Sequence, residues 1–80
     1  MDTVRLERDA GGDVVIPAEE AARLLGVALA PLLPDLRAGR VFSLVERGEG
    51  ADAVRLRLTL RWRGREARVV VEEGTGRVLG

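Results

Sequence analysis

The sequence has 80 residues, and its thirteen arginines balance thirteen acidic residues to give a formal net charge of zero. It contains no lysine, histidine, cysteine, tyrosine, asparagine or glutamine. Histidine and cysteine are the usual zinc ligands, and lysine, cysteine or a serine paired with histidine are the usual activated nucleophiles. The composition therefore excludes most catalytic constellations, and we predict a non-enzymatic protein without a cofactor or metal.

The length is that of a single domain covering residues 1–80. A chain of this size buries only about 60 to 65% of the surface that it exposes when unfolded, so its core is marginal. Because disulfides are excluded, we expect a homodimer to supply further burial. No apolar run approaches the roughly 18 to 20 residues of a membrane span, and the N-terminus is charged rather than signal-like. We expect a cytoplasmic protein without a membrane partner.

The N-terminal quarter predicts a hairpin followed by a helix. Residues 3–8 alternate apolar and polar side chains, and the glycine pair at residues 11–12 can turn the chain into residues 14–16. Pro17 suits the first position of a helix, because no N–H donor is needed there. We expect this helix to cover residues 18–25.

The next segment predicts a second, shorter helix. Gly26 is typical of the left-handed residue that ends a helix, so residues 27–40 form a separate unit. Pro31 and Pro34 cannot both lie comfortably inside one helix, since proline lacks the N–H that donates to the preceding turn. We therefore expect the helix to begin near one of these prolines and to end at Gly39. Its apolar face consists of Leu29, Leu32, Leu33 and Leu36.

The C-terminal half predicts an antiparallel meander. A strand over residues 41–47 and a loop over residues 48–52 precede the clearest strand, residues 54–62, in which apolar and polar side chains alternate strictly. The core-facing side chains of this clearest strand are Val54, Leu56, Leu58, Leu60 and Trp62. We also expect Phe42, the only other aromatic side chain, to point inward.

A two-residue turn at residues 63–64 sets the register of the next strand, residues 66–72, and a last turn leads into residues 77–79. The expected pairs are Leu60 with Ala67, Leu58 with Val69, Leu56 with Val71, Arg61 with Glu66 and Arg55 with Glu72. Together the elements predict an α+β domain. Its antiparallel sheet has four to six strands, formed by the N-terminal hairpin and the C-terminal three-stranded meander, and one or two short helices pack on one face.

Four arginines align along the central strand, with Arg68 of the next strand beside them. The four are Arg55, Arg57, Arg61 and Arg63. Guanidinium groups aligned in this way could bind phosphates or carboxylates through paired hydrogen bonds. The alternative, which we favour, is a solvated face partly neutralised by Glu66 and Glu72. Sheets that bind nucleic acids carry stacking aromatic residues among the basic ones, whereas the two aromatic residues of this chain are expected to point inward.

An acidic loop follows the first strand of the meander, and its candidate binding residues are Glu46, Arg47, Glu49 and Asp52. The acids do not have the spacing of a twelve-residue calcium loop, so a connecting turn is favoured over a magnesium or calcium site. If Phe42 and Leu44 point inward, alternation carries Glu46 to the same face. A carboxylate there needs a partner such as Arg47, Arg55 or a backbone amide.

Residues 16–27, followed by residues 36–40, resemble the opening of excisionase-type winged-helix regulators. In that family a helix ending in a Leu-Gly-Val step leads to a recognition helix that enters the major groove. Here the corresponding residues 28–35 are apolar, contain two prolines and carry an acid, so they lack the groups that contact bases or phosphates. The resemblance implies a retained scaffold without the DNA-reading chemistry.

A closer resemblance covers most of the chain. Residues 36–41, 43–53, 57–60 and 68–71 resemble a family of short bacterial proteins of unknown function. Its most specific part is the loop Glu46-Arg47-Gly48-Glu49-Gly50-Ala51-Asp52-Ala53. The resemblance implies a free-standing small domain and an importance for the Glu46 loop, and it implies no activity.

The sequence therefore predicts an interaction or regulatory module whose partner is a second copy of itself or another protein. We expect the contact surface on the four leucines of the second helix or on free strand edges, because the helix holds more leucines than an 80-residue monomer easily buries. The alternative is a degenerate winged-helix protein that contacts DNA phosphates through Arg37, Arg40 and the arginine strand. A weaker alternative is a carboxylate or metal enzyme centred on the acidic loop.

Overall fold

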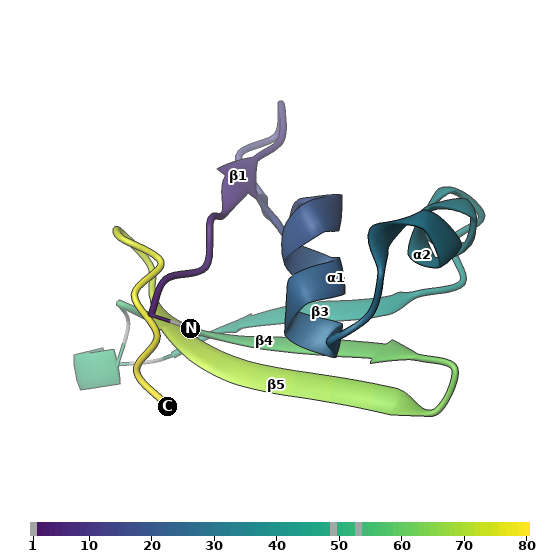
Figure 1. Cartoon of the computed structure of the whole chain (residues 1–80). Helices are drawn as coiled ribbons and strands as arrows, with labels where there is room; N and C mark the ends of the chain where they lie inside the picture. Colours follow the sequence, from purple (N-terminus) through teal and green to yellow (C-terminus); the bar gives the residue numbers. More distant parts are fainter. Residues whose placement is uncertain (1, 49, 53) are drawn as a thin grey trace.

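The computed structural model describes residues 2–48, 50–52 and 54–80, and its longest elements are the two strands of a C-terminal hairpin and a helix that packs near them (Figure 1). The element bounds are β1 Glu7–Arg8, β2 Val14–Val15, α1 Ala18–Leu25, α2 Leu29–Arg37, β3 Phe42–Arg47, a 3₁₀ turn Gly50–Asp52, β4 Arg55–Trp62 and β5 Arg65–Glu72. The architecture is α+β, as the sequence predicts. Over the described ranges, no helix is long and apolar enough to cross a membrane.

The pairing of β4 with β5 has the predicted register. The pairs include Leu60 with Ala67, Leu58 with Val69, Leu56 with Val71, Arg61 with Glu66 and Arg55 with Glu72. The two turn residues, Arg63 and Gly64, have φ angles of 48° and 77°, as the twist of a two-residue hairpin requires. Val54 departs from the expected alternation, because β4 begins one residue later and leaves this side chain 60% exposed.

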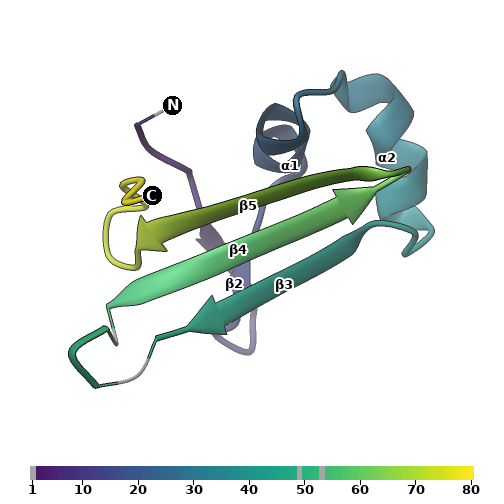
Figure 2. The same ribbon diagram turned by 90° about the horizontal axis from the view of Figure 1, so that it is seen from below.

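The strands form two separate antiparallel sheets. β3, β4 and β5 make a three-stranded sheet with β4 at its centre, whereas β1 and β2 pair only with each other. Both helices lie on one side of the three-stranded sheet (Figure 1), and the view from below shows the three strands with no helix in front of them (Figure 2). The sheet therefore has an inner face covered by helices and an open outer face.

Helix α1 has the expected bounds, and its capping residue is Pro17. The ψ angle of 153° keeps Pro17 outside the helix, while its carbonyl accepts the N–H of Ala21 at 2.9 Å. Gly26 ends the helix at a φ of 69°, and the N–H of Val27 donates to the carbonyl of Ala22. The left-handed stop predicted from the sequence is thus confirmed.

Helix α2 begins at Leu29, earlier than expected, and contains both prolines. Pro31 lies in the first turn, where backbone N–H groups have no acceptor within the helix. Pro34 lies further inside and cannot donate to the carbonyl of Ala30, but Ala30 is an exposed residue whose carbonyl can be hydrated. The start thus lies two residues before the nearer of the expected positions, and the expectation that the two prolines could not both lie in one helix is wrong.

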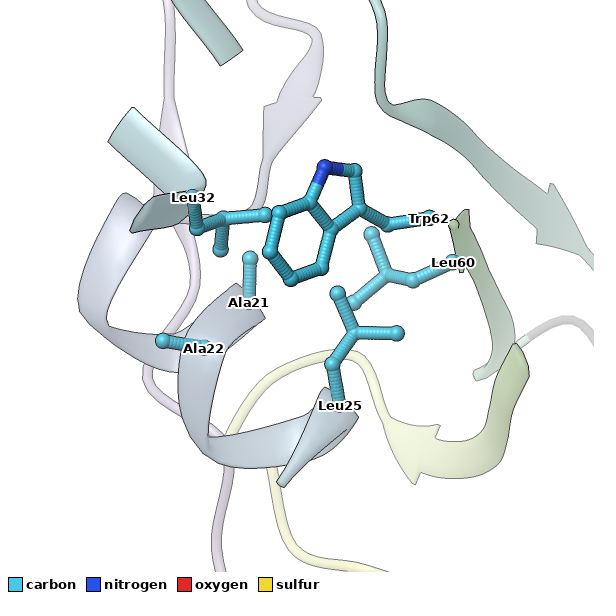
Figure 3. Packing of buried hydrophobic residues seen from close by; sticks show 6 residues of the cluster. All are labelled: Ala21, Ala22, Leu25, Leu32, Leu60 and Trp62. Atoms are coloured by element: carbon cyan, nitrogen blue, oxygen red, sulfur yellow. The ribbon is translucent and has the colours of Figure 1, made fainter. Parts of the chain in front are cut away.

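Two core clusters share the inward-facing residues of β4. The first joins both helices to the sheet (Figure 3), and its buried members are Ala21, Ala22, Leu25, Leu32, Leu60 and Trp62. The second lies under the N-terminal segment, and its buried members are Val4, Leu56, Leu58 and Val71. The strict alternation of β4 thus supplies one strand that packs into both clusters.

The two ends of the chain lie side by side at one end of the sheet (Figure 1). Val4, which is fully buried, donates its N–H to the carbonyl of Gly76 at 2.8 Å. The tail then runs along β5: the N–H of Val70 donates to Gly80 at 2.8 Å, and the N–H of Leu79 donates to Val70 at 2.7 Å. The tail therefore covers the C-terminal end of the β5 edge, at Val70 and Glu72.

Candidate functional site

The outer face of the three-stranded sheet carries most of the candidate residues. Pairing across the strands sorts its side chains into rows: Phe42, Arg61 and Glu66; then Leu44, Thr59 and Arg68; then Glu46, Arg57 and Val70. Arg55 and Glu72 complete the face beyond the end of β3. Because directly opposed residues share a face, Phe42 lies beside Arg61 and Leu44 beside Thr59.

The side chains of Phe42 and Leu44 point away from the core, contrary to the expectation that they point inward. They are 45% and 41% exposed. The register explains the difference: the buried Leu58 of β4 pairs with Val45, so the alternate residues of β3 face outward. Trp62 does point inward and is buried.

The arginines of β4 on this face bind glutamates. Arg57 donates from Nε to Glu46 at 2.9 Å, so Glu46 is paired on the outer face with the residue directly opposite rather than with the expected Arg47 or Arg55. Arg61 likewise donates from Nε to Glu66 at 2.7 Å. These pairs support the solvated, partly neutralised face over a bare anion-binding stripe.

The fourth arginine of the predicted stripe, Arg63, lies in the β4–β5 turn and not on the outer face. Its Nε is 3.3 Å from Oδ2 of Asp35 in α2. The shortest contact of Asp35 is with Trp62, the only tryptophan of the chain, whose indole N–H donates to the same oxygen at 2.7 Å. Arg40 approaches from the other side, with Nη1 3.8 Å from Oδ1.

Asp35 is a structural residue that the sequence analysis did not single out. Its side chain is only 11% exposed, yet its pKa lies below the usual 3.8. The hydrogen bond from Trp62 is the main cause, and the charges of Arg63 and Arg40 add to it, so that together they outweigh the effect of burial. The buried carboxylate is therefore ionised and pins α2 to the end of β4.

Three glutamates also have pKa values below their usual 4.5. Glu46, Glu66 and Glu73 each accept hydrogen bonds from arginine guanidinium groups, and those bonds favour the charged form. A carboxyl whose pKa is lower in the folded state stabilises the fold above its unfolded pKa. It loses that contribution as the pH falls through the folded value.

We expect the melting temperature to stay level between about pH 6 and about pH 9, because the chain has no histidine or cysteine side chain to titrate there and no lysine or tyrosine just above that range. Below the usual glutamate pKa of 4.5 it should fall steadily, since unfolding then takes up protons. Circular dichroism melts across this range measure the slope. The double variant Glu46→Gln with Glu66→Gln should show a shallower acid slope, and an unchanged slope would contradict the assignment.

In the acidic loop, Arg47 connects the end of β3 to residues distant in the chain. Arg47 donates from Nε and Nη2 to the two carboxylate oxygens of Glu73 at 2.9 and 2.7 Å, and Arg8 reaches the same carboxylate at 2.8 Å. This cluster ties the end of β3 to the N-terminal hairpin. Glu49 and the side chain of Asp52 lie outside the described residues. Among the side chains that are described, no three acids gather as a metal site requires.

The leucine face of α2 packs into the core of its own chain. Leu32 is completely buried, and Leu29 and Leu36 pack against the first core cluster. Leu33 is partly buried. The chain therefore buries most of these leucines itself, which removes the reason for placing a contact surface on this helix.

A comparison with known families covers the whole chain. A family model described as a family of unknown function, DUF6522, matches residues 1–80. The chain belongs to this family. No curated protein and no solved structure matches it. Membership in DUF6522 confirms the predicted resemblance to a family without an assigned activity, so the function of this DUF6522 protein has to be argued from its surfaces.

Proposed function

We propose that this DUF6522 protein is a non-enzymatic interaction module that forms a homodimer through the edge of β3. The observation that carries the proposal is the position of β3 at the edge of its sheet, with no neighbouring strand on its other side in the described chain. Two of the most exposed large apolar side chains, Phe42 and Leu44, lie on this strand. A free strand edge is a template for pairing with another chain.

The first four residues of β3 lack the features that usually prevent such pairing. Proteins protect edge strands with prolines, lysines, inward-pointing charges or a covering segment. The tail provides that cover for the C-terminal end of β5, through the backbone hydrogen bonds of Val70, Leu79 and Gly80. The rest of the β5 edge carries three charged residues, Arg65, Glu66 and Arg68. β3 has no proline, its first four residues are uncharged, and its one inward-facing charge, Arg47, lies at the far end of the strand opposite Leu56. This contrast between the two edges supports pairing through the first part of β3.

Antiparallel pairing of two β3 strands around a two-fold axis at Leu44 fits the side chains of the outer face. Directly opposed residues share a face, so the two Leu44 side chains meet at the axis and each Phe42 lies opposite a Glu46 of the second copy. Glu46 is already neutralised by Arg57, so no unpaired charge is brought into the contact. The two three-stranded sheets then form one sheet with all helices on the same side.

We expect Leu44→Arg to convert the dimer into a monomer, because it places two like charges against each other at the axis. Sedimentation equilibrium at micromolar concentration measures the change. Val15→Arg is the matched control, since Val15 is 40% exposed and Leu44 41%, but Val15 lies in the N-terminal hairpin. A monomeric wild-type protein, or a Leu44→Arg variant that still dimerises, would refute the proposed contact.

The geometry supports DNA binding less than it supports the homodimer. The sequence resemblance assigns the recognition helix of a winged-helix regulator to α2, but the leucines of α2 pack into the core and its acid binds Trp62. The outer face offers four arginines against three glutamates, which is a weak field for a phosphate backbone. A titration with a mixed DNA duplex at low salt tests this alternative, and we expect no binding.

A further inference from the structure

We infer that the end of the sheet at the β4–β5 turn is an anion site for ligands that carry a terminal phosphate dianion. A hollow of about 300 Å³ opens there, between the start of β3 and the turn. Four arginines and one acid line it, namely Arg40, Arg61, Arg63, Arg65 and Glu66. The hollow shares Arg61 and Arg63 with the predicted stripe and adds Arg40 and Arg65, which the stripe does not include.

Positive charge is in excess at this hollow. Glu66 binds Arg61 at 2.7 Å, whereas Asp35 has to serve both Arg63 at 3.3 Å and Arg40 at 3.8 Å. Arg65 has no acidic partner among the side chains that the structure describes. The four guanidinium groups thus share two carboxylates, one of which, Glu66, also lies 3.4 Å from Arg68. Among the described side chains, at least two positive charges remain without a counterion.

Two of the guanidinium groups are held in place before any ligand arrives. The guanidinium carbon of Arg61 lies 5.0 Å from the centroid of the Phe42 ring, and that of Arg63 lies 4.9 Å from the Trp62 ring. Both arginines contact their carboxylates through Nε. Their terminal amino groups are therefore left for a ligand, and little side-chain freedom has to be lost on binding.

The backbone of Arg63 adds a second argument. Its φ of 48° lies in the left-handed region, and Arg63 is the only non-glycine residue of the described chain with a positive φ. The first position of such a two-residue turn favours asparagine, aspartate or glycine, so arginine is strained there. Backbone strain of this kind concentrates at binding sites, where the side chain serves a purpose that the turn alone does not need.

The chemistry of the hollow favours a terminal phosphate over other anions. Two uncompensated positive charges match a dianion, whereas a phosphodiester or a single carboxylate carries one charge. The three terminal oxygens of a phosphate ester accept hydrogen bonds from several guanidinium groups at once, and arginine forms such paired bonds readily. Free phosphate and a phosphorylated molecule share this chemistry.

The single tryptophan beside the hollow reports binding directly. We would titrate inorganic phosphate at a pH above its second ionisation and follow Trp62 fluorescence, with the ionic strength held constant by sodium chloride. We expect a saturable change that chloride alone does not produce. Arg65→Gln should weaken binding about tenfold, since hydrogen bonds to charged groups are the strong ones.

Arg77→Gln is the matched control, because it removes the same charge beyond the far end of β5, where Arg77 lies 3.6 Å from Glu72. It should leave the midpoint unchanged, and equal weakening by both variants would overturn the site in favour of general attraction. An absence of any saturable fluorescence change would overturn the site as well.

O-phosphoserine should compete with phosphate, whereas tighter binding of a DNA duplex would overturn the terminal-phosphate assignment. The Leu44→Arg variant should still bind phosphate, which separates this site from the proposed dimer.

Discussion

Trp62→Ala is expected to lower the free energy of unfolding by about 3–5 kcal/mol, the usual cost of deleting a large buried aromatic side chain. Trp62 is 7% exposed and packs against both helices in the first core cluster (Figure 3). A domain of 80 residues has a total stability of only about 4–12 kcal/mol, so this loss removes between about a quarter and all of it. Urea unfolding followed by far-ultraviolet circular dichroism measures the loss.

The hydrogen bond to Asp35 contributes separately from the packing of the ring. Trp62→Phe keeps most of the apolar contacts but removes the indole N–H, and we expect a loss of about 1–3 kcal/mol. Phe42→Ala is the control for losing an aromatic ring, because Phe42 is 45% exposed on the open face and should cost about 0.5–1 kcal/mol. Equal stability of the Trp62→Phe variant and the wild-type protein would show that the bond to Asp35 does not stabilise the fold.

The sequence was most informative where local geometry sets the pairing. Alternation along β4 and a two-residue turn leave one register for β5, and all five predicted pairs occur. The turn from β3 into β4 is longer and gives no such constraint. The composition of β3 does not alternate either, since Leu44 and Val45 are adjacent apolar residues. The outward orientation of Phe42 and Leu44 therefore followed only from the three-dimensional pairing with β4.

The contacts at the end of the sheet were harder to predict, because they join residues distant in the chain. One signal was present: a buried tryptophan needs an acceptor for its indole N–H, and Asp35 is the only acid of a leucine-rich helix. Nothing comparable marked Arg40 or Arg65. Arg40 reaches the hollow because α2 ends beside the β4–β5 turn, which is a property of the packing and not of any local motif. Arg65 lies there because it begins β5 directly after that turn.

Gly76→Ala is expected to be the most damaging substitution of a glycine in the described chain. Gly76 is buried at a φ of 74°, and an added Cβ would overlap the carbonyl oxygen of Val4. The obstacle is backbone, so no side-chain rotation can relieve it. The left-handed φ costs about 1–2 kcal/mol and the overlap about 1–3 kcal/mol more. Gly39→Ala is the matched control, with a φ of 72° and nothing within 4 Å, and should show the first cost alone.

Gly76→Ala should also change the oligomeric state of the protein. Displacing the backbone around Gly76 loosens its bond with Val4 and the tail that follows, whose Leu79 and Gly80 pair with Val70 at the C-terminal end of β5. The free edge of β5 then extends along the whole strand, and sheets with two long free edges can join into chains of more than two copies. Sedimentation velocity should therefore show species larger than a dimer for Gly76→Ala and none for Gly39→Ala. Equal stability and equal size of the two variants would contradict this role of Gly76.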